Sequence, residues 1–221
     1  MAKKTEVVSI KPLEIKKVHM RIEGDTPIII HAWSEKAKRQ IFGDPDITGK
    51  KKQPRNPARD FIDSLYWLTE KPTITDDMDS EECEKAYIEA VKKGAKFGFP
   101  VSGLKQAGIS AAYRLGWSKD KMSLRGAFYI ETEYDDMLCI EGEPPVIRED
   151  YVRVGMGSAD LRYRGEIKNW HADFTVSYNM NGQYSLEDIV NVINAGGYVC
   201  GLGDWRPERD GQYGMFHVAT A

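Results

Sequence analysis

The stretch that decides the fold lies near the C-terminus and runs from Ser185 to Val218 as SLEDIVNVINAGGYVCGLGDWRPERDGQYGMFHV. It opens with a serine that can cap a helix, followed by two acidic residues that favour a helix N-terminus and by apolar residues at helical spacing. This pattern predicts a short amphipathic helix that stops at Gly196 and Gly197, and then a strand over residues 198–201. Residues 215–218 read as another strand.

Between these two strands lies a glycine-rich loop, residues 201–214, with the sequence GLGDWRPERDGQYG. Glycine lets a backbone approach a ligand closely, guanidinium groups pair with phosphate, and aromatic rings stack on bases. The loop is therefore a candidate nucleic-acid site, although a wide hairpin with surface charge has the same composition. Its candidate contact residues are Gly201, Gly203, Trp205, Arg206, Arg209, Gly211, Tyr213 and Gly214.

The order of helix, strand and Gly-x-Gly…Gly-x-x-Gly loop resembles the C-terminal signature of the RAMP superfamily, the repeat-associated RNA-binding proteins of CRISPR effector complexes. A second segment resembles the RAMP motif in which a proline, two small residues and a lysine open a helix that ends in arginine. The matching positions are Pro100, Ser102, Gly103, Lys105 and Arg114. The following Gln-Ala-Gly-Ile departs from the family's usual Gly-Ala-Leu-Arg. The resemblance implies an α+β fold with a ferredoxin-like, RRM-type antiparallel sheet, helices and large insertions.

Other segments agree with a mixed fold. Apolar alternation predicts strands over residues 7–23, 126–132, 137–140, 146–154, 161–164 and 170–178. Helical spacing predicts helices over residues 56–68 and 81–93 and from Pro100 onward, and residues 119–125 are expected to end a helix. The apolar run over residues 28–33 is compatible with either the end of a strand or a turn into a helix.

Length and composition limit the number of domains and the classes of protein that the chain can belong to. At 221 residues the chain can form one domain with a sizeable core, and we expect a single RAMP-like domain over residues 1–221. No apolar run approaches membrane-spanning length, and the start Met-Ala-Lys-Lys lacks the apolar core of a signal peptide, which predicts an intracellular protein. The resemblance implies the cytoplasm of a bacterial or phage-infected cell. Three widely spaced cysteines without a Cys-x-x-Cys pair predict neither structural zinc nor a disulfide scaffold. No metal or organic cofactor is expected.

The net charge of −3 requires any contact with nucleic acid to be local. Cations gather in a basic arm at residues 34–60, where glycine, proline and three consecutive lysines indicate a flexible insertion. The alternatives are a solvated loop and an arm that contacts phosphates, and RAMP backbone subunits have such a thumb inserted early in the chain. The candidate contact residues of the arm are Lys36, Lys38, Arg39, Lys50, Lys51, Lys52 and Arg55.

Arginines also gather in the C-terminal half, on predicted strand edges and loops. Arg148, Arg153, Arg162 and Arg164 join Arg206 and Arg209 as one candidate groove, and Lys105 adds a cation at a predicted helix N-terminus, where free amides favour phosphate. The alternative is that these arginines pair with acids close to them in the sequence. Those acids are Glu149, Asp150, Asp160, Glu166 and Asp204.

No catalytic residue is assigned. The four histidines have no fixed spacing, and neither a nucleophile elbow nor a Walker-type phosphate loop is present. Some RAMP backbone proteins cut RNA with an aspartate in the early insertion, and Asp44 or Asp46 occupies a comparable place. Aspartates beside prolines are also ordinary turn formers.

We therefore expect a protein that binds single-stranded nucleic acid, RNA in preference to DNA, without strong sequence preference, through phosphate contacts and aromatic stacking. The resemblance implies assembly along the strand as a homo-oligomer or filament, as in a CRISPR effector backbone, with other ribonucleoprotein subunits as partners and no membrane. The chain also resembles uncharacterised bacteriophage proteins. Alternatives are a phage single-stranded-DNA-binding or annealing protein, a ribonuclease, and a virion structural subunit.

Overall fold

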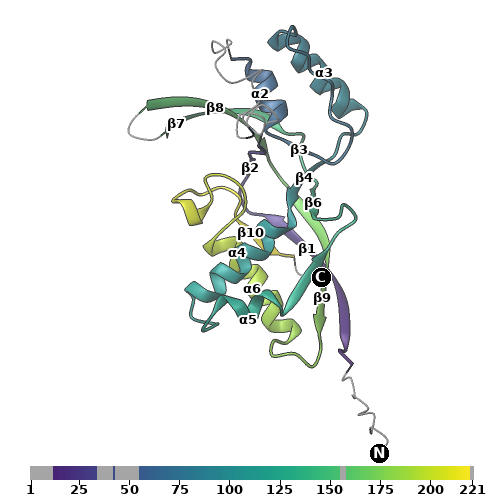
Figure 1. Cartoon of the computed structure of the whole chain (residues 1–221), viewed down its shortest axis with the longest axis vertical. Helices are drawn as coiled ribbons and strands as arrows, with labels where there is room; N and C mark the ends of the chain where they lie inside the picture. The colour runs from purple at the N-terminus through teal and green to yellow at the C-terminus, as the bar shows by residue number, and fades with distance from the viewer. Residues whose placement is uncertain (1–11, 34–41, 43–54, 155–157, 220–221) are drawn as a thin grey trace, which may run out of the picture.

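A four-stranded antiparallel sheet forms the lower half of the molecule, with two helices on one of its faces (Figure 1). The computed structural model describes residues 12–33, 42, 55–154 and 158–219. In chain order the core elements are strand β1 (Ile15–Gly24), helix α4 (Val101–Arg114), strands β5 (Phe128–Glu131) and β9 (His171–Asn179), helix α6 (Leu186–Val199) and strand β10 (Phe216–Val218). The sheet order β10-β1-β9-β5 makes this a βαββαβ, ferredoxin-like core, so the predicted α+β fold class is confirmed.

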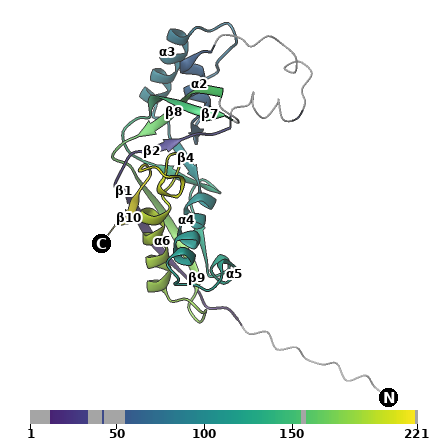
Figure 2. The same cartoon turned by 90° about the vertical axis from the view of Figure 1, so that its left-hand side faces the viewer.

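Alternation along the two central strands separates a buried face from an open one. β1 and β9 pair from Ile15 opposite Asn179 to Glu23 opposite His171. Met20 and Ile22 of β1 are buried, as are Phe174 and Val176 of β9, because successive side chains of a strand point to opposite faces. Figure 2 shows α4 and α6 together on the covered face.

The two helices cross at glycine, which explains a wrong prediction. A Cβ on Gly196 would lie 2.7 Å from the backbone nitrogen of Gly108 in α4, and a Cβ on Gly197 would clash with the backbone of Phe216 in β10. These glycines therefore allow α6 to pack closely against α4 and β10 rather than ending the helix. The predicted stop at Gly196 and the predicted strand over residues 198–201 are both wrong, because α6 continues to Val199 and an irregular turn follows.

Two insertions build the upper half of the molecule. The first, between β1 and α4, holds β2 (Ile28–Ile30), α2 (Pro57–Asp63), β3 (Tyr66–Trp67), α3 (Ser80–Lys92) and β4 (Phe97–Pro100). The second, between β5 and β9, holds β6 (Met137–Ile140) and the long hairpin of β7 (Val146–Val154) and β8 (Ser158–Ile167). They form two three-stranded sheets, β2-β8-β7 and β3-β4-β6.

Local signals account for most element boundaries. Asn56 caps α2 by accepting a hydrogen bond from the Arg59 N–H, and Asp79 and Glu82 form a capping box on α3. The predicted helix over residues 56–68 is too long, because α2 ends at Asp63 and residues 66–67 pair with β4. Residues 119–125 do not end a helix but hold a short one of their own, α5 (Lys121–Arg125).

One continuous set of buried side chains runs through both halves, and it includes Ile28, Phe61, Leu104, Trp170 and Phe216. The glycine-rich loop, with its short 3-10 helix η1 (Pro207–Arg209), lies beside the lower end of the β7–β8 hairpin. None of the described helices is both long and apolar enough to cross a bilayer.

Candidate nucleic-acid interface

The glycine-rich loop is tightly folded on itself and on β2. The N–H of Gly211 donates to the Arg206 carbonyl at 3.1 Å, and the N–H of Tyr213 donates to the Trp205 carbonyl at 3.0 Å. The N–H of Gly214 donates to Pro27 at 2.8 Å, which ties the end of the loop to the start of β2. The loop is thus a preorganised surface.

Its glycines serve the protein's own packing. Gly203 has a φ of 77°, and a Cβ there would clash with the carbonyl oxygen of Ile29. Gly214 has a φ of 65°, and a Cβ there would clash with the carbonyl oxygen of Leu202. Gly201, Gly203 and Gly214 are all buried, so the expectation that these glycines bring the backbone close to a ligand does not hold for them.

Two of the predicted side chains point outward from this rigid turn. Trp205 is 39% exposed and has a φ of 54°, a left-handed backbone that a bulky residue rarely adopts. Arg209 is exposed and makes no ion pair with any described residue. Arg206 differs, because its guanidinium donates to Glu208 at 3.0 and 3.2 Å and to the Gly203 carbonyl at 3.0 Å.

A charge network joins the loop to the β7–β8 hairpin. Arg148 donates to Asp150 at 3.0 Å and to Glu166 at 2.7 Å, and its guanidinium stacks 4.5 Å from the ring centre of Tyr213. Arg164 is 4% exposed and donates to Asp150 at 3.0 Å. The strand register brings these groups together, because Arg148 lies opposite Arg164 and Asp150 lies opposite Arg162.

Asp204 extends this network to the loop. Its carboxylate lies 3.1 Å from Arg164 Nε in an ion pair without hydrogen-bond geometry, and 3.2 Å from His31 Nδ1. Burial alone would raise the pKa of Asp204, but the hydrogen bond with His31 and the positive charge of Arg164 hold that pKa below its ordinary value. Burial would lower the pKa of Arg148, yet its hydrogen bonds to Glu166 and Tyr213 hold it above the ordinary value.

The candidate arginine groove is therefore corrected in part. Arg148 and Arg164 are engaged with carboxylates, and three of the five acids named as alternative partners, Asp150, Glu166 and Asp204, hold them. We leave Arg148, Arg164 and Arg206 out of the interface as direct contacts, because a guanidinium whose donors are already satisfied inside the protein has little left for phosphate.

The other predicted contact residues lie in several places. Arg55 pairs with Asp160 at 2.7 Å, and Arg162 lies 3.9 Å from the same carboxylate. Arg153 is exposed near the end of β7. Lys36, Lys38, Arg39, Lys50, Lys51 and Lys52 of the basic arm, with Asp44 and Asp46, lie outside the residues that the structure describes.

Lys105 lies in α4 and faces aromatic rings. Its ammonium lies 4.6 Å from the ring centre of Tyr129 and 5.3 Å from that of Phe128. Burial lowers the pKa of Lys105. The contact with the rings stabilises the fold. Because the rings partly cover the ammonium, less of it is exposed for a phosphate.

The open face of the four-stranded sheet is acidic. Lys17 pairs with Glu131, and Arg21 donates to both oxygens of Asp173 at 2.9 and 2.6 Å, which lowers the pKa of that carboxyl. The open sides of the described β1 and β9 carry no Phe, Tyr or Trp, and the exposed ring on this face is Tyr129 of the edge strand β5, opposite Ser177. Carboxylates outnumber lysines and arginines here, and the two central strands offer no ring, so this face is a poorer candidate for an RRM-type stacking platform than the edge beside the glycine-rich loop. Its carboxylates are Glu23, Asp25, Glu131, Glu141 and Asp173.

A second group of cations lies beside the loop and was not among the predicted contact residues. Residues 101–125 hold five basic residues and one acidic residue, a signal that was available in the sequence. Arg114 at the end of α4 donates to Glu208 of η1 at 2.8 Å, which joins this segment to the glycine-rich loop. We name the group the basic rim. It consists of Arg114, Lys119, Lys121, Arg125 and Arg209.

The basic rim has more cations than nearby acids can neutralise. Glu208 is shared by Arg114 and Arg206, and Asp120 is engaged as the cap of α5 through the Ser123 N–H at 2.8 Å. Among the described residues, no carboxylate pairs with the other four rim cations. This edge therefore carries local positive charge on a chain that is acidic overall.

Comparison with known proteins adds a remote likeness of fold. No model of a known protein family and no curated protein sequence matches the chain. Among solved structures, the chain is similar to a chain of the cryo-EM structure of the Type III-B Cmr-beta bound to cognate target RNA. The sequence identity is 11% and the TM-score 0.48, over 94% of this chain and 60% of that one. The chain spans about three fifths of that neighbour's length.

Proposed function

We propose that the protein binds single-stranded nucleic acid, RNA in preference to DNA, without strong base-sequence preference. The observation that carries this proposal is the unbalanced charge of the basic rim beside the rigid loop that presents Trp205 and Arg209. Cations without carboxylate partners bind phosphates and release counterions, and an exposed ring stacks on a base.

The route of the strand in this proposal follows the helical edge. It passes the end of α4, α5 and the outer side of the glycine-rich loop. Arg162 extends it onto the hairpin face that carries Arg148, whereas Arg153 lies on the opposite face of the hairpin. The open face of the sheet is left out because its lysine and arginine, Lys17 and Arg21, are paired with Glu131 and Asp173, and its other carboxylates are not matched by lysine or arginine. The arm residues Lys36, Lys38, Arg39, Lys50, Lys51, Lys52 and Arg55 are proposed as further phosphate contacts on the strength of their charge alone.

We also propose that several copies assemble along one strand, as a RAMP backbone subunit would. Sedimentation of the protein with long and short RNA tests this part separately. Complexes whose mass grows in steps with RNA length are the expected result, and a single copy bound at every length contradicts it.

The binding proposal is tested by fluorescence anisotropy with labelled RNA and DNA strands of equal length and sequence. We expect tighter binding to RNA and a logarithm of the affinity that falls by about 0.7 for each contacted phosphate per tenfold rise in salt. The variant Lys119→Ala/Arg209→Ala removes two rim cations and is expected to weaken binding about equally across sequences.

A matched control removes the same charge elsewhere. Lys92 and Lys93, at the end of α3, are exposed and lie in the upper half of the molecule, far from α5 (Figure 1). Lys92→Ala/Lys93→Ala should leave the affinity close to that of the wild type. Equal losses in the two double variants would remove the rim from the interface, and no binding by the wild type at low salt would end the proposal.

A further inference from the structure

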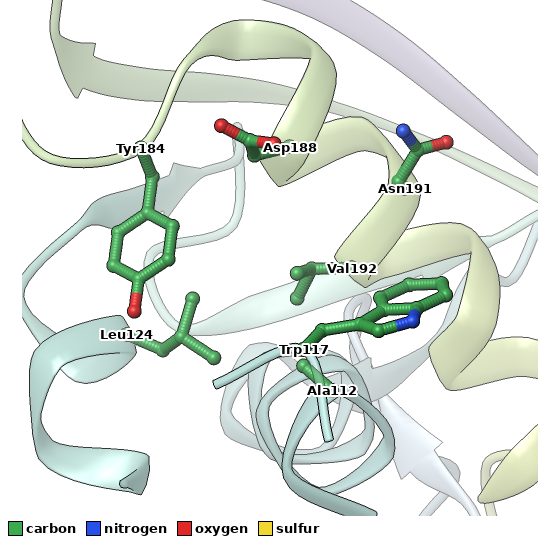
Figure 3. Close-up of a pocket in the computed structure, with 7 residues that line it drawn as sticks. All are labelled: Ala112, Trp117, Leu124, Tyr184, Asp188, Asn191 and Val192. Atoms are coloured by element: carbon green, nitrogen blue, oxygen red, sulfur yellow. The ribbon is translucent and has the colours of Figure 1, made fainter. Parts of the chain in front are cut away.

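A cavity of about 350 Å³ opens beside the basic rim, between α4, α5 and α6 (Figure 3). Its volume is at the lower end of ordinary small-ligand sites. Ala112, Trp117 and Leu124 form the wall on the α4 and α5 side. Tyr184, Asp188, Asn191 and Val192 form the wall on the α6 side.

The end of α4 explains why a tryptophan stands at this cavity. Gly116 has a φ of 73° and donates its N–H to Tyr113, and the N–H of Trp117 donates to Ala112 at 2.9 Å. This pair of bonds is a Schellman motif, which turns the chain back across the last turn of the helix. Trp117 is consequently directed to the cavity wall next to Ala112 while 56% of its surface stays exposed.

A second ring stands at the other end of the cavity and is held in place. The hydroxyl of Tyr184 lies 2.8 Å from the hydroxyl of Ser123 and 3.2 Å from that of Ser118. Ser118 in turn donates to the Asp120 carbonyl at 2.6 Å. Figure 3 shows the rings of Tyr184 and Trp117 at opposite ends, with Leu124 and Val192 between them. The cavity therefore has fixed aromatic ends and an apolar centre.

Its polar groups select what can enter. Asp188 Oδ2 accepts hydrogen bonds from Ser185, which lower the pKa of this carboxyl, while the Asn191 amide makes no hydrogen bond to any described residue. An ionised carboxylate repels phosphate but accepts from N–H groups, and an amide both donates and accepts. A flat, neutral ring with N–H donors and acceptors on its edge satisfies these groups, and a nucleobase has that chemistry.

We propose that this cavity binds one base of the single strand. The strand's phosphates stay outside, on Lys119 and Lys121 of the basic rim, which lie two and four positions after Trp117. Lys121 lies 5.4 Å from the ring centre of Tyr113 and donates to the Ser110 hydroxyl at 3.4 Å, so Lys119 is the freer of the two cations. The inference rests on the proposed function, because it assigns a base site within the same interface.

Exposed apolar residues near the cavity, Leu115 and Met122, suit a protein partner as well. The charge of the rim favours the nucleic acid, since four rim cations have no carboxylate partner among the described residues. Docking of a second copy is accordingly an outcome of the test.

The test compares a single strand with the same sugar-phosphate backbone lacking its bases. The wild type is expected to bind the complete strand on the order of tenfold more tightly or better, since one stacked base contributes that much. Trp117→Ala should lose most of this advantage while its affinity for the abasic strand stays unchanged. Asn191→Ala, an exposed side chain without hydrogen bonds to described residues, is the second variant in case Trp117→Ala folds poorly.

A direct readout uses the indole N–H signals of the five tryptophans during titration with a nucleoside monophosphate. The Trp117 signal, assigned by its loss in Trp117→Phe, should shift and saturate, whereas that of buried Trp170 should not move. Binding of the complete and abasic strands with equal affinity overturns the base site and the stacking on Trp205, and it leaves the phosphate contacts of the proposed function intact. Failure to bind either strand at low salt overturns both. Equal weakening of both strands in Trp117→Ala, together with loss of self-association in light scattering, assigns the surface to a second copy instead.

Discussion

Replacing Arg164 with methionine should destabilise the protein without removing a contact to nucleic acid. Methionine keeps the buried length of the side chain and removes only the guanidinium. In the wild type this group donates to Asp150 at 3.0 Å and lies 3.1 Å from Asp204. The variant leaves both carboxylates with one cation fewer.

The size of the loss follows from the two contacts. A hydrogen bond to a buried charge contributes about 1.5–3 kcal/mol, and a half-exposed ion pair contributes about 0.2–1 kcal/mol. Asp150 keeps its bond from Arg148, and Asp204 is exposed enough to regain water, so the penalty stays below that of a fully stranded buried charge. We expect the free energy of unfolding to fall by about 2–4 kcal/mol.

Chemical denaturation followed by circular dichroism and by tryptophan fluorescence measures this change, and coincidence of the two signals checks that a single transition is being compared. Arg209→Met is the matched control, because the same substitution at an exposed residue should change stability by less than about 0.5 kcal/mol. Unchanged stability of Arg164→Met, combined with a loss of RNA affinity as large as that of Arg209→Met, would refute the view that Arg164 is structural.

Three further predictions concern other parts of the molecule. In Arg209→Met, loss of one phosphate contact should reduce the slope of log affinity against log salt by about 0.7, measured by anisotropy over a salt series; an unchanged slope places Arg209 off the strand. Gly203→Ala should destabilise by more than about 2 kcal/mol because of its φ of 77° and the clash with Ile29, whereas Gly94→Ala, with a φ of 87° and open space, should cost only about 1 kcal/mol in the same denaturation assay. The Arg21 hydrogen bond lowers the pKa of Asp173, so its stabilisation is present above the unfolded pKa of about 4 and is lost as pH falls through the lower folded pKa. Arg21→Met should raise that pKa in a ¹³C NMR titration, and an unshifted titration contradicts the assignment.

Much of the fold was readable from local patterns. Alternation over residues 170–178 predicted β9, and Ser185 with the acids after it predicted the start of α6, where Ser185 and Asp188 form a capping box. The end of α6 was not readable in the same way. Gly196 and Gly197 have the composition of a helix stop, but they stay helical because α4 and β10 approach them too closely for any side chain.

Less of the candidate site than of the fold could be predicted from the sequence. Residues 201–214 do form an irregular loop, and Trp205 and Arg209 are exposed on it, while its role as a nucleic-acid site stays a prediction. The basic rim was present in the sequence as a run with five basic residues and one acidic residue, yet composition alone could not place it beside the loop. The Arg114–Glu208 bond, across α4 and η1, makes that connection.

Side-chain periodicity within short segments was enough to predict the α+β class and the order of the core elements. Packing, and not the sequence pattern, explains why glycine is required at Gly196, Gly197 and Gly203, because α4, β10 and β2 approach these positions too closely for a side chain. Only the tertiary structure decided which arginines remain available to a ligand. Arg164 and Arg209 are the same type of residue. Strand pairing brings Arg164 next to Asp150, and the glycine-rich loop adds Asp204 beside it. The turn at η1 instead directs Arg209 to solvent. Whether a cation is neutralised depends on neighbours far away in the chain, and folding alone brings those neighbours together.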